Sequence, residues 1–72
     1  MSHSKLWPLL DKMQEECLCV QREHHSNGKT QIRILSPFWE VLHDGWYTTG
    51  DTDRQCYVME RVLNQYIGGE YD

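Results

Sequence analysis

The segment Ser26-Asn27-Gly28 constrains the fold most, because it predicts a tight turn between two runs of residues that favour β-structure. A three-residue hairpin loop ends on a residue with positive φ, and Gly28 adopts that conformation without steric cost. A loop of this length pairs His25 with Lys29. The segment therefore fixes where the two strands meet.

The register that follows from this loop brings apolar side chains together. The expected pairs are Val20 with Ile34, Arg22 with Ile32, and Cys19 with Leu35. A two-residue turn at Asn27-Gly28 would shift the pairing by one residue and place Glu23 opposite Ile32. The side-chain pattern thus favours the longer loop and predicts a hairpin over residues 18–36.

A first helix is predicted over about residues 4–16, because its apolar residues recur at helical spacing. Ser4 can serve as its N-cap, and Pro8 is tolerated because it falls in the first turn. Trp7 lies on the flank of the apolar stripe. The residues of that stripe are Leu6, Leu9, Leu10, Met13 and Cys17.

A second helix is predicted over about residues 53–67. Thr52 and Gln55 have the spacing of a capping box, and Gly68-Gly69 provides a stop signal. Residues 68–72 are expected to form a frayed tail. The apolar face of this helix comprises Cys56, Met59, Val62, Leu63, Tyr66 and Ile67.

The segment between residues 36 and 50 admits two interpretations. In one, Asp44-Gly45 is the turn of a second hairpin over residues 38–49, in which His43 pairs with Trp46. In the other, Ser36 caps a short helix that ends at Gly45. We favour the hairpin, which predicts an α+β fold: one small domain over residues 1–72, with two helices covering a small antiparallel sheet.

Composition and charge limit the function without identifying it. Seven basic and eleven acidic residues give a net charge of −4, which does not indicate a nucleic-acid-binding protein. The sequence contains neither a signal-peptide pattern nor a membrane-length apolar run, so we expect a cytoplasmic protein without membrane contact. Three cysteines are a poor disulfide framework and are expected to be reduced thiols.

Two chemical sites can be written from the sequence, and neither has the required pattern. A zinc-binding structural domain would use Cys17, Cys19, His24 and His25, but Cys-x-Cys lacks the usual ligand spacing. A nucleophilic site at Cys56 would place the thiol on the apolar face of a helix, where it is inert. We therefore expect no metal, no cofactor and no enzymatic activity.

A second alternative is a weak nucleic-acid-binding module on the hairpin between residues 22 and 33. This segment carries a modest group of basic and titratable residues: Arg22, Lys29 and Arg33, together with His24 and His25. Charged residues on exposed strands also discourage pairing between sheet edges, so such a group need not indicate a partner.

The remaining signal is aromatic, because three Trp and four Tyr exceed what a small core can bury. Exposed Trp, Tyr and Arg side chains are typical anchors of protein interfaces. The sequence thus predicts a protein-binding regulator, inhibitor or accessory subunit, of a size typical of phage or mobile-element proteins, with a homodimer as an open alternative. The candidate interface residues are Trp7, Trp39, Trp46, Tyr47, Tyr57 and Arg61.

Overall fold

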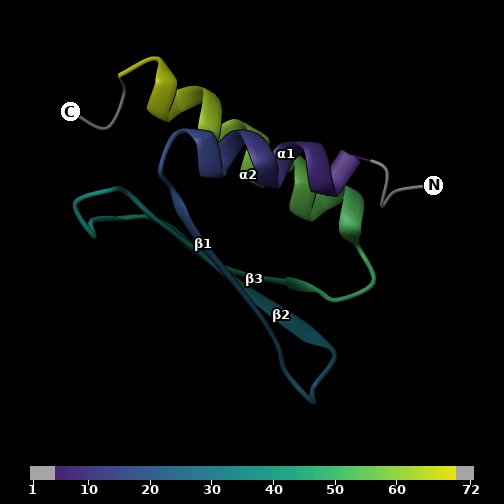
Figure 1. The fold of residues 1–72 in the computed structure, drawn as a ribbon. Coiled ribbons are helices and arrows are strands. Elements are labelled where there is room, and N and C mark those ends of the chain that lie inside the picture. Colours follow the sequence, from purple (N-terminus) through teal and green to yellow (C-terminus); the bar gives the residue numbers. More distant parts are fainter. Residues whose placement is uncertain (1–4, 70–72) are drawn as a thin grey trace.

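The computed structural model describes residues 5–69 and confirms the α+β fold. The elements in chain order are α1 (Leu6–Glu15), β1 (Cys19–His24), β2 (Lys29–Leu35), β3 (Val41–Thr48) and α2 (Thr52–Ile67). The strands form one antiparallel sheet in the order β1-β2-β3, and the two helices lie side by side on one face of it (Figure 1). Within residues 5–69, neither helix combines the length and the apolarity that a membrane crossing requires.

The hairpin between β1 and β2 has the predicted loop and the predicted register. Gly28 has a φ of 79°, and the His25 amide donates to the carbonyl oxygen of Lys29 at 2.8 Å. The Asn27 side chain accepts a hydrogen bond from the Lys29 amide at 3.0 Å, which stabilises the turn. Val20 lies opposite Ile34, as expected from the alternation of side chains.

The core lies between the sheet and the two helices. Ile32 and Ile34 of the central strand are completely buried, as are Met13 of α1 and Met59 of α2. Burying each such side chain contributes roughly 1.5–3 kcal/mol before the entropy of folding is subtracted. The opposite face of the sheet has no helix over it (Figure 1).

The predicted turn at Asp44-Gly45 is wrong, and so is the alternative short helix. Both residues lie inside β3, where Asp44 pairs with Arg33 and Gly45 pairs with Ile32. The second hairpin is instead formed by β2 and β3 around residues 36–40. Asp-Gly favours a turn locally, but pairing the whole of β3 with β2 satisfies more backbone hydrogen bonds.

The helix ends also differ from prediction. Asp51, not Thr52, is the N-cap of α2, and its carboxylate accepts a hydrogen bond from the Arg54 amide at 3.1 Å. Cys17 is exposed after α1 with a φ of 62°, so it does not join the core. Ile67 is exposed too. The predicted cap Ser4 and the tail residues 70–72 lie outside the described residues.

Gln55 is a fully buried polar residue that connects α2 to both edges of the sheet. Its side-chain amide donates to the carbonyl oxygens of Thr48 and Thr49 at 2.9 and 3.3 Å. Its Oε1 accepts a hydrogen bond from Arg22 Nη2 of β1 at 3.0 Å. Because these hydrogen bonds are shielded from water, they fix the position of the first turns of α2 over the sheet.

Replacing Gly28 with Ala should lower the free energy of unfolding by about 1–2 kcal/mol, because an L-residue is strained at positive φ. No atom lies within 4 Å of the added Cβ, so the cost is conformational and not steric. Gly50→Ala is the matched control, since its Cβ also meets open space without a positive φ. Urea unfolding of both variants measures the difference, and an equal effect would contradict the assigned turn.

Candidate functional site

The predicted interface aromatics do not form one surface. Trp7, Trp39, Trp46 and Tyr57 are all exposed, as expected, but they lie on α1, the β2–β3 loop, β3 and α2 respectively. Tyr47 is only partly exposed and packs against the core. The sequence therefore identified exposed side chains but not which of them act together.

The basic residues of the first hairpin are divided between the two faces of the sheet. Arg22 lies on the helix-covered face, where it binds Gln55. Arg33 lies on the open face and forms an ion pair with Asp44 at 3.6 Å. The exposed Lys29 remains near the turn, so the structure does not bring the three cations together.

The two histidines of this hairpin have contacts within the fold. His24 Nδ1 forms a hydrogen bond with Thr30 Oγ1 at 2.6 Å. The His25 ring lies 4.6 Å from the ring of Trp46, measured between centroids. Their side chains therefore support the local structure of the hairpin.

The cysteines that the sequence offered as metal ligands or as a nucleophile lie apart in the described part of the chain, with Cys17 exposed, Cys19 half-buried and Cys56 buried. No three residues among the His, Cys, Asp and Glu of residues 5–69 are grouped so that they could hold a metal ion. Cys56 is buried, and burial raises the pKa of its thiol, which disfavours the reactive thiolate.

The loop between β2 and β3 is tightly organised by one residue, Ser36. Its hydroxyl oxygen accepts hydrogen bonds from the amides of Phe38 and Glu40 at 3.1 and 3.2 Å. The Ser36 amide donates to the Glu40 carbonyl at 2.8 Å, and its own carbonyl accepts from the Trp39 amide at 2.9 Å. Four hydrogen bonds across five residues restrict the backbone of this loop.

This loop holds two large aromatic side chains in water. Phe38 is 79% exposed and Trp39 is 72% exposed. Trp39 also has a φ of 66°, a left-handed conformation that costs an L-residue about 1–2 kcal/mol. Neither burial nor backbone preference explains a Trp at this position, and strained residues of this kind often occur at functional sites.

A groove of about 510 Å³ lies beside the loop. Its walls come from three segments that are distant in sequence, namely the end of α1, the β2–β3 loop with the start of β3, and the end of α2. The apolar part of the lining is formed by Phe38, Leu42, Tyr66 and Ile67, and the two carboxylates are those of Glu16 and Glu40. The groove is thus apolar and negatively charged.

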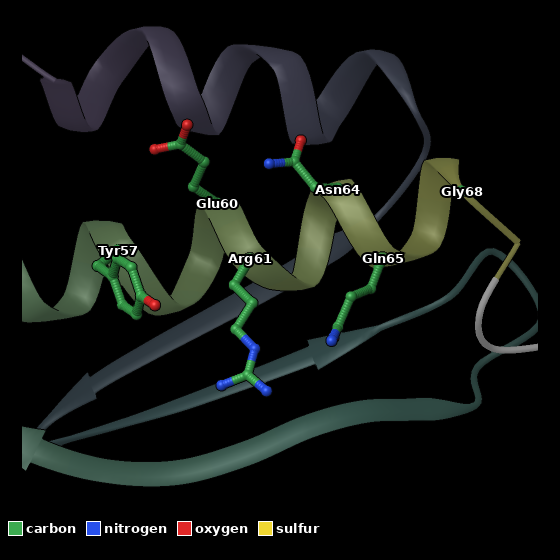
Figure 2. Close-up of a pocket in the computed structure, with 6 residues that line it drawn as sticks. All are labelled: Tyr57, Glu60, Arg61, Asn64, Gln65 and Gly68. Carbon is green, nitrogen blue, oxygen red and sulfur yellow. The ribbon is translucent and has the colours of Figure 1, made fainter.

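A second hollow, of about 530 Å³, runs along the surface of α2 (Figure 2). Figure 2 shows Arg61 and Gln65 pointing toward the sheet, whereas Glu60 and Asn64 point toward α1. Tyr57 and Arg61, two of the predicted interface residues, share this hollow. Because its lining residues all belong to α2 or to its C-cap, Gly68, its shape depends on surface rotamers and not on packing between elements.

A third hollow, of about 300 Å³, lies between β3 and α2. One wall contains His43 and Tyr47, whose Nε2 and Oη atoms form a hydrogen bond at 2.6 Å. Burial lowers the pKa of His43 below its usual 6.5, although Asp44 acts in the opposite direction. Burial likewise raises the pKa of Tyr47 above 10.0, with Arg54 opposing it.

Gly45 makes the contact between His43 and Tyr47 possible. A Cβ at this position would lie 2.7 Å from Tyr47 Oη and 2.9 Å from His43 Nε2. The two side chains therefore meet across the space that the missing side chain leaves. A glycine inside a strand commonly marks such a close approach, so the residue read as a turn signal has a packing role instead.

Comparison with known proteins identified no relative: no family model, no curated protein and no solved structure matches the chain. Sequence reasoning missed Phe38, Ile67 and the two flanking glutamates. Only the run of two aromatics after Ser36-Pro37 could have indicated an exposed loop.

The lowered pKa of His43 predicts how stability depends on pH. As the pH falls below 6.5, His43 binds a proton more readily in the unfolded chain than in the folded chain, where its pKa is lower. The free energy of unfolding therefore falls as the pH falls. Urea midpoints measured between about pH 7.5 and about pH 5.5 should decrease. His43→Gln should make this dependence shallower, and an unchanged slope would contradict the assignment.

Proposed function

We propose that this protein binds another protein through the β2–β3 loop and the adjacent groove, in a non-enzymatic role as a regulator, inhibitor or accessory subunit. The partner segment inserts an apolar side chain beside Phe38 and carries Lys or Arg next to it. The conformation of Trp39 carries the proposal. Its large side chain is held in solvent at a position where glycine would be less strained.

The rigidity of the loop favours binding, because a preorganised surface loses less conformational entropy when the complex forms. Exposed aromatics on flexible loops would have to be immobilised, whereas the hydrogen bonds of Ser36 already restrict Phe38 and Trp39. Trp and Phe also bury a large area with few rotatable bonds. Two such exposed residues, adjacent in sequence, are suitable anchors for a partner.

The charge of the groove favours a basic partner segment. Glu16 and Glu40 line it together, and its lining contains no basic residue. A cationic side chain beside an apolar anchor would compensate both carboxylates. Self-association through the same groove is disfavoured, since a two-fold contact would bring two such negative surfaces together.

Selection of peptides from a random library on the immobilised protein should enrich sequences with an aromatic or large aliphatic residue next to Lys or Arg. Glu16→Gln and Glu40→Gln should each weaken the selected peptides by about two- to fivefold, because rim charges contribute modestly. Titration calorimetry measures the effect. Enrichment of acidic peptides, or no enrichment, would contradict the proposal.

Trp39→Gly should separate binding from stability. Removing the strained L-residue should leave the free energy of unfolding unchanged or raise it by up to about 1 kcal/mol. The selected peptides should nevertheless lose at least about tenfold in affinity, as expected for an anchor residue.

Trp46→Thr is the matched control, since it removes an exposed Trp from the open face of the sheet and keeps β-propensity. It should bind the peptides normally. Loss of stability in Trp39→Gly, or equal loss of affinity in both variants, would show that Trp39 is not the anchor.

A further inference from the structure

The hollow between β3 and α2 differs from the other two described above. It is lined by two arginines, and its walls come from two different elements. Arg54 and Arg61 both line it, with His43 and Tyr47 on the opposite wall and Val58 and Val62 on the helix side. Its lining contains no acidic residue, although the whole chain has a net charge of −4. The charged residues that line this hollow are thus all basic, whereas the chain as a whole is acidic.

Neither arginine has a charge partner in the described part of the chain. Within residues 5–69 Arg33 forms an ion pair with Asp44, and His25 lies 4.0 Å from Glu23, whereas the guanidinium groups of Arg54 and Arg61 form no ion pair. Asp44 lies next to His43 in sequence, but its carboxylate is engaged with Arg33 and Gln31 on the open face of the sheet. Two unpaired guanidinium groups facing one hollow indicate a site for an anion.

The opposite wall of the hollow is held in place by the pair formed across Gly45. The rings of His43 and Tyr47 stack with centroids 5.9 Å apart, and their hydrogen bond restrains the Tyr47 hydroxyl. A neutral His43 that donates from Nε2 leaves the Tyr47 hydroxyl free to donate to a bound oxygen. Arg54 is close enough to Tyr47 to lower its pKa against the effect of burial.

We propose that this hollow binds the phosphate group of a phosphate monoester. A phosphate monoester carries a charge of about −1.5 to −2 at neutral pH. This charge balances two arginines that form no ion pair more completely than the single negative charge of a carboxylate ligand would. Guanidinium groups also fit phosphate oxygens with paired hydrogen bonds. The organic part of the ester lies against the half-buried Val58, since a hollow of about 300 Å³ exceeds the size of phosphate alone.

This site is independent of the protein-binding groove. The groove is lined by the ends of both helices, the β2–β3 loop and the start of β3, whereas the hollow lies along β3 and the side of α2 from Arg54 to Gln65. No residue lines both. Failure of one proposal therefore leaves the other intact. Substitutions in the hollow also spare Phe38 and Trp39.

The test is an NMR titration of the labelled protein at constant ionic strength, with chloride as the balancing anion. The probes are inorganic phosphate, phenyl phosphate, dimethyl phosphate and a short peptide containing phosphoserine. We expect saturable shifts of the Arg54 and Arg61 side-chain signals and of Tyr47 with the monoesters. Phenyl phosphate or the phosphopeptide should bind more tightly than inorganic phosphate, and the tighter of these two identifies the source of the ester. Dimethyl phosphate, a monoanion, should bind most weakly.

Arg54→Ala and Arg61→Ala should each weaken monoester binding by about tenfold, as expected for a charge-assisted contact. Both side chains are exposed, so the variants should keep the fold, which their spectra verify. Lys29→Ala removes the same charge elsewhere and should bind normally. Gly45→Ala should weaken binding without any change of charge, because the added Cβ displaces the hydroxyl of Tyr47.

Three results would overturn the proposal. The first is the absence of saturable shifts at Arg54, Arg61 and Tyr47 with any phosphate at millimolar concentrations. The second is an equal loss of affinity in Lys29→Ala, which would indicate unspecific attraction to positive charge. The third is binding of inorganic phosphate with no gain from an ester, which would indicate an adventitious ion only.

Discussion

The buried amide of Gln55 is the interaction on which the arrangement of this small protein depends. It donates to the backbone at the end of β3 and accepts from Arg22 of β1, so one side chain joins α2 to both edge strands. Arg22 is half-buried, and its buried Nε has no hydrogen-bond partner within the fold. An apolar residue in place of Gln55 would also remove the acceptor of Arg22 Nη2, and a buried donor without a partner is costly. Hydrophobic contacts hold α2 on the sheet, and this polar connection determines where along the sheet it lies.

The position of α2 in turn shapes the two surfaces to which we assign functions. Toward its first turns, α2 faces the inner side of β3 and closes the hollow with Arg54. At its last turn, Tyr66 and Ile67 approach the β2–β3 loop and form a wall of the groove. The hydrogen bonds of Gln55 are made at the N-terminal end of the helix, so a shift of that end would alter both surfaces together.

The sequence predicted the β1–β2 hairpin because two independent constraints agreed, namely the positive φ required of Gly28 and the pairing of Val20 with Ile34. At Gly45 the local signal was misleading. Asp-Gly is a favoured turn pair, and nothing nearby in sequence reveals that His43 and Tyr47 meet across this glycine. The groove could not be predicted either, because its walls are brought together only by the packing of three distant segments.

Both candidate surfaces contain residues that weaken the fold locally. Trp39 adopts a left-handed backbone conformation, and Glu16 lies at the C-cap of α1, where the helix dipole disfavours an acidic side chain by about 0.3–1 kcal/mol. Arg54 lies in the first turn of α2, where the same dipole disfavours a cation. Such departures from local preference are expected at functional positions. The helix dipoles also add to the electrostatic potential of these residues: it is more positive beside Arg54 and more negative beside Glu16. Each unfavourable placement therefore strengthens the attraction of its surface for a ligand of opposite charge.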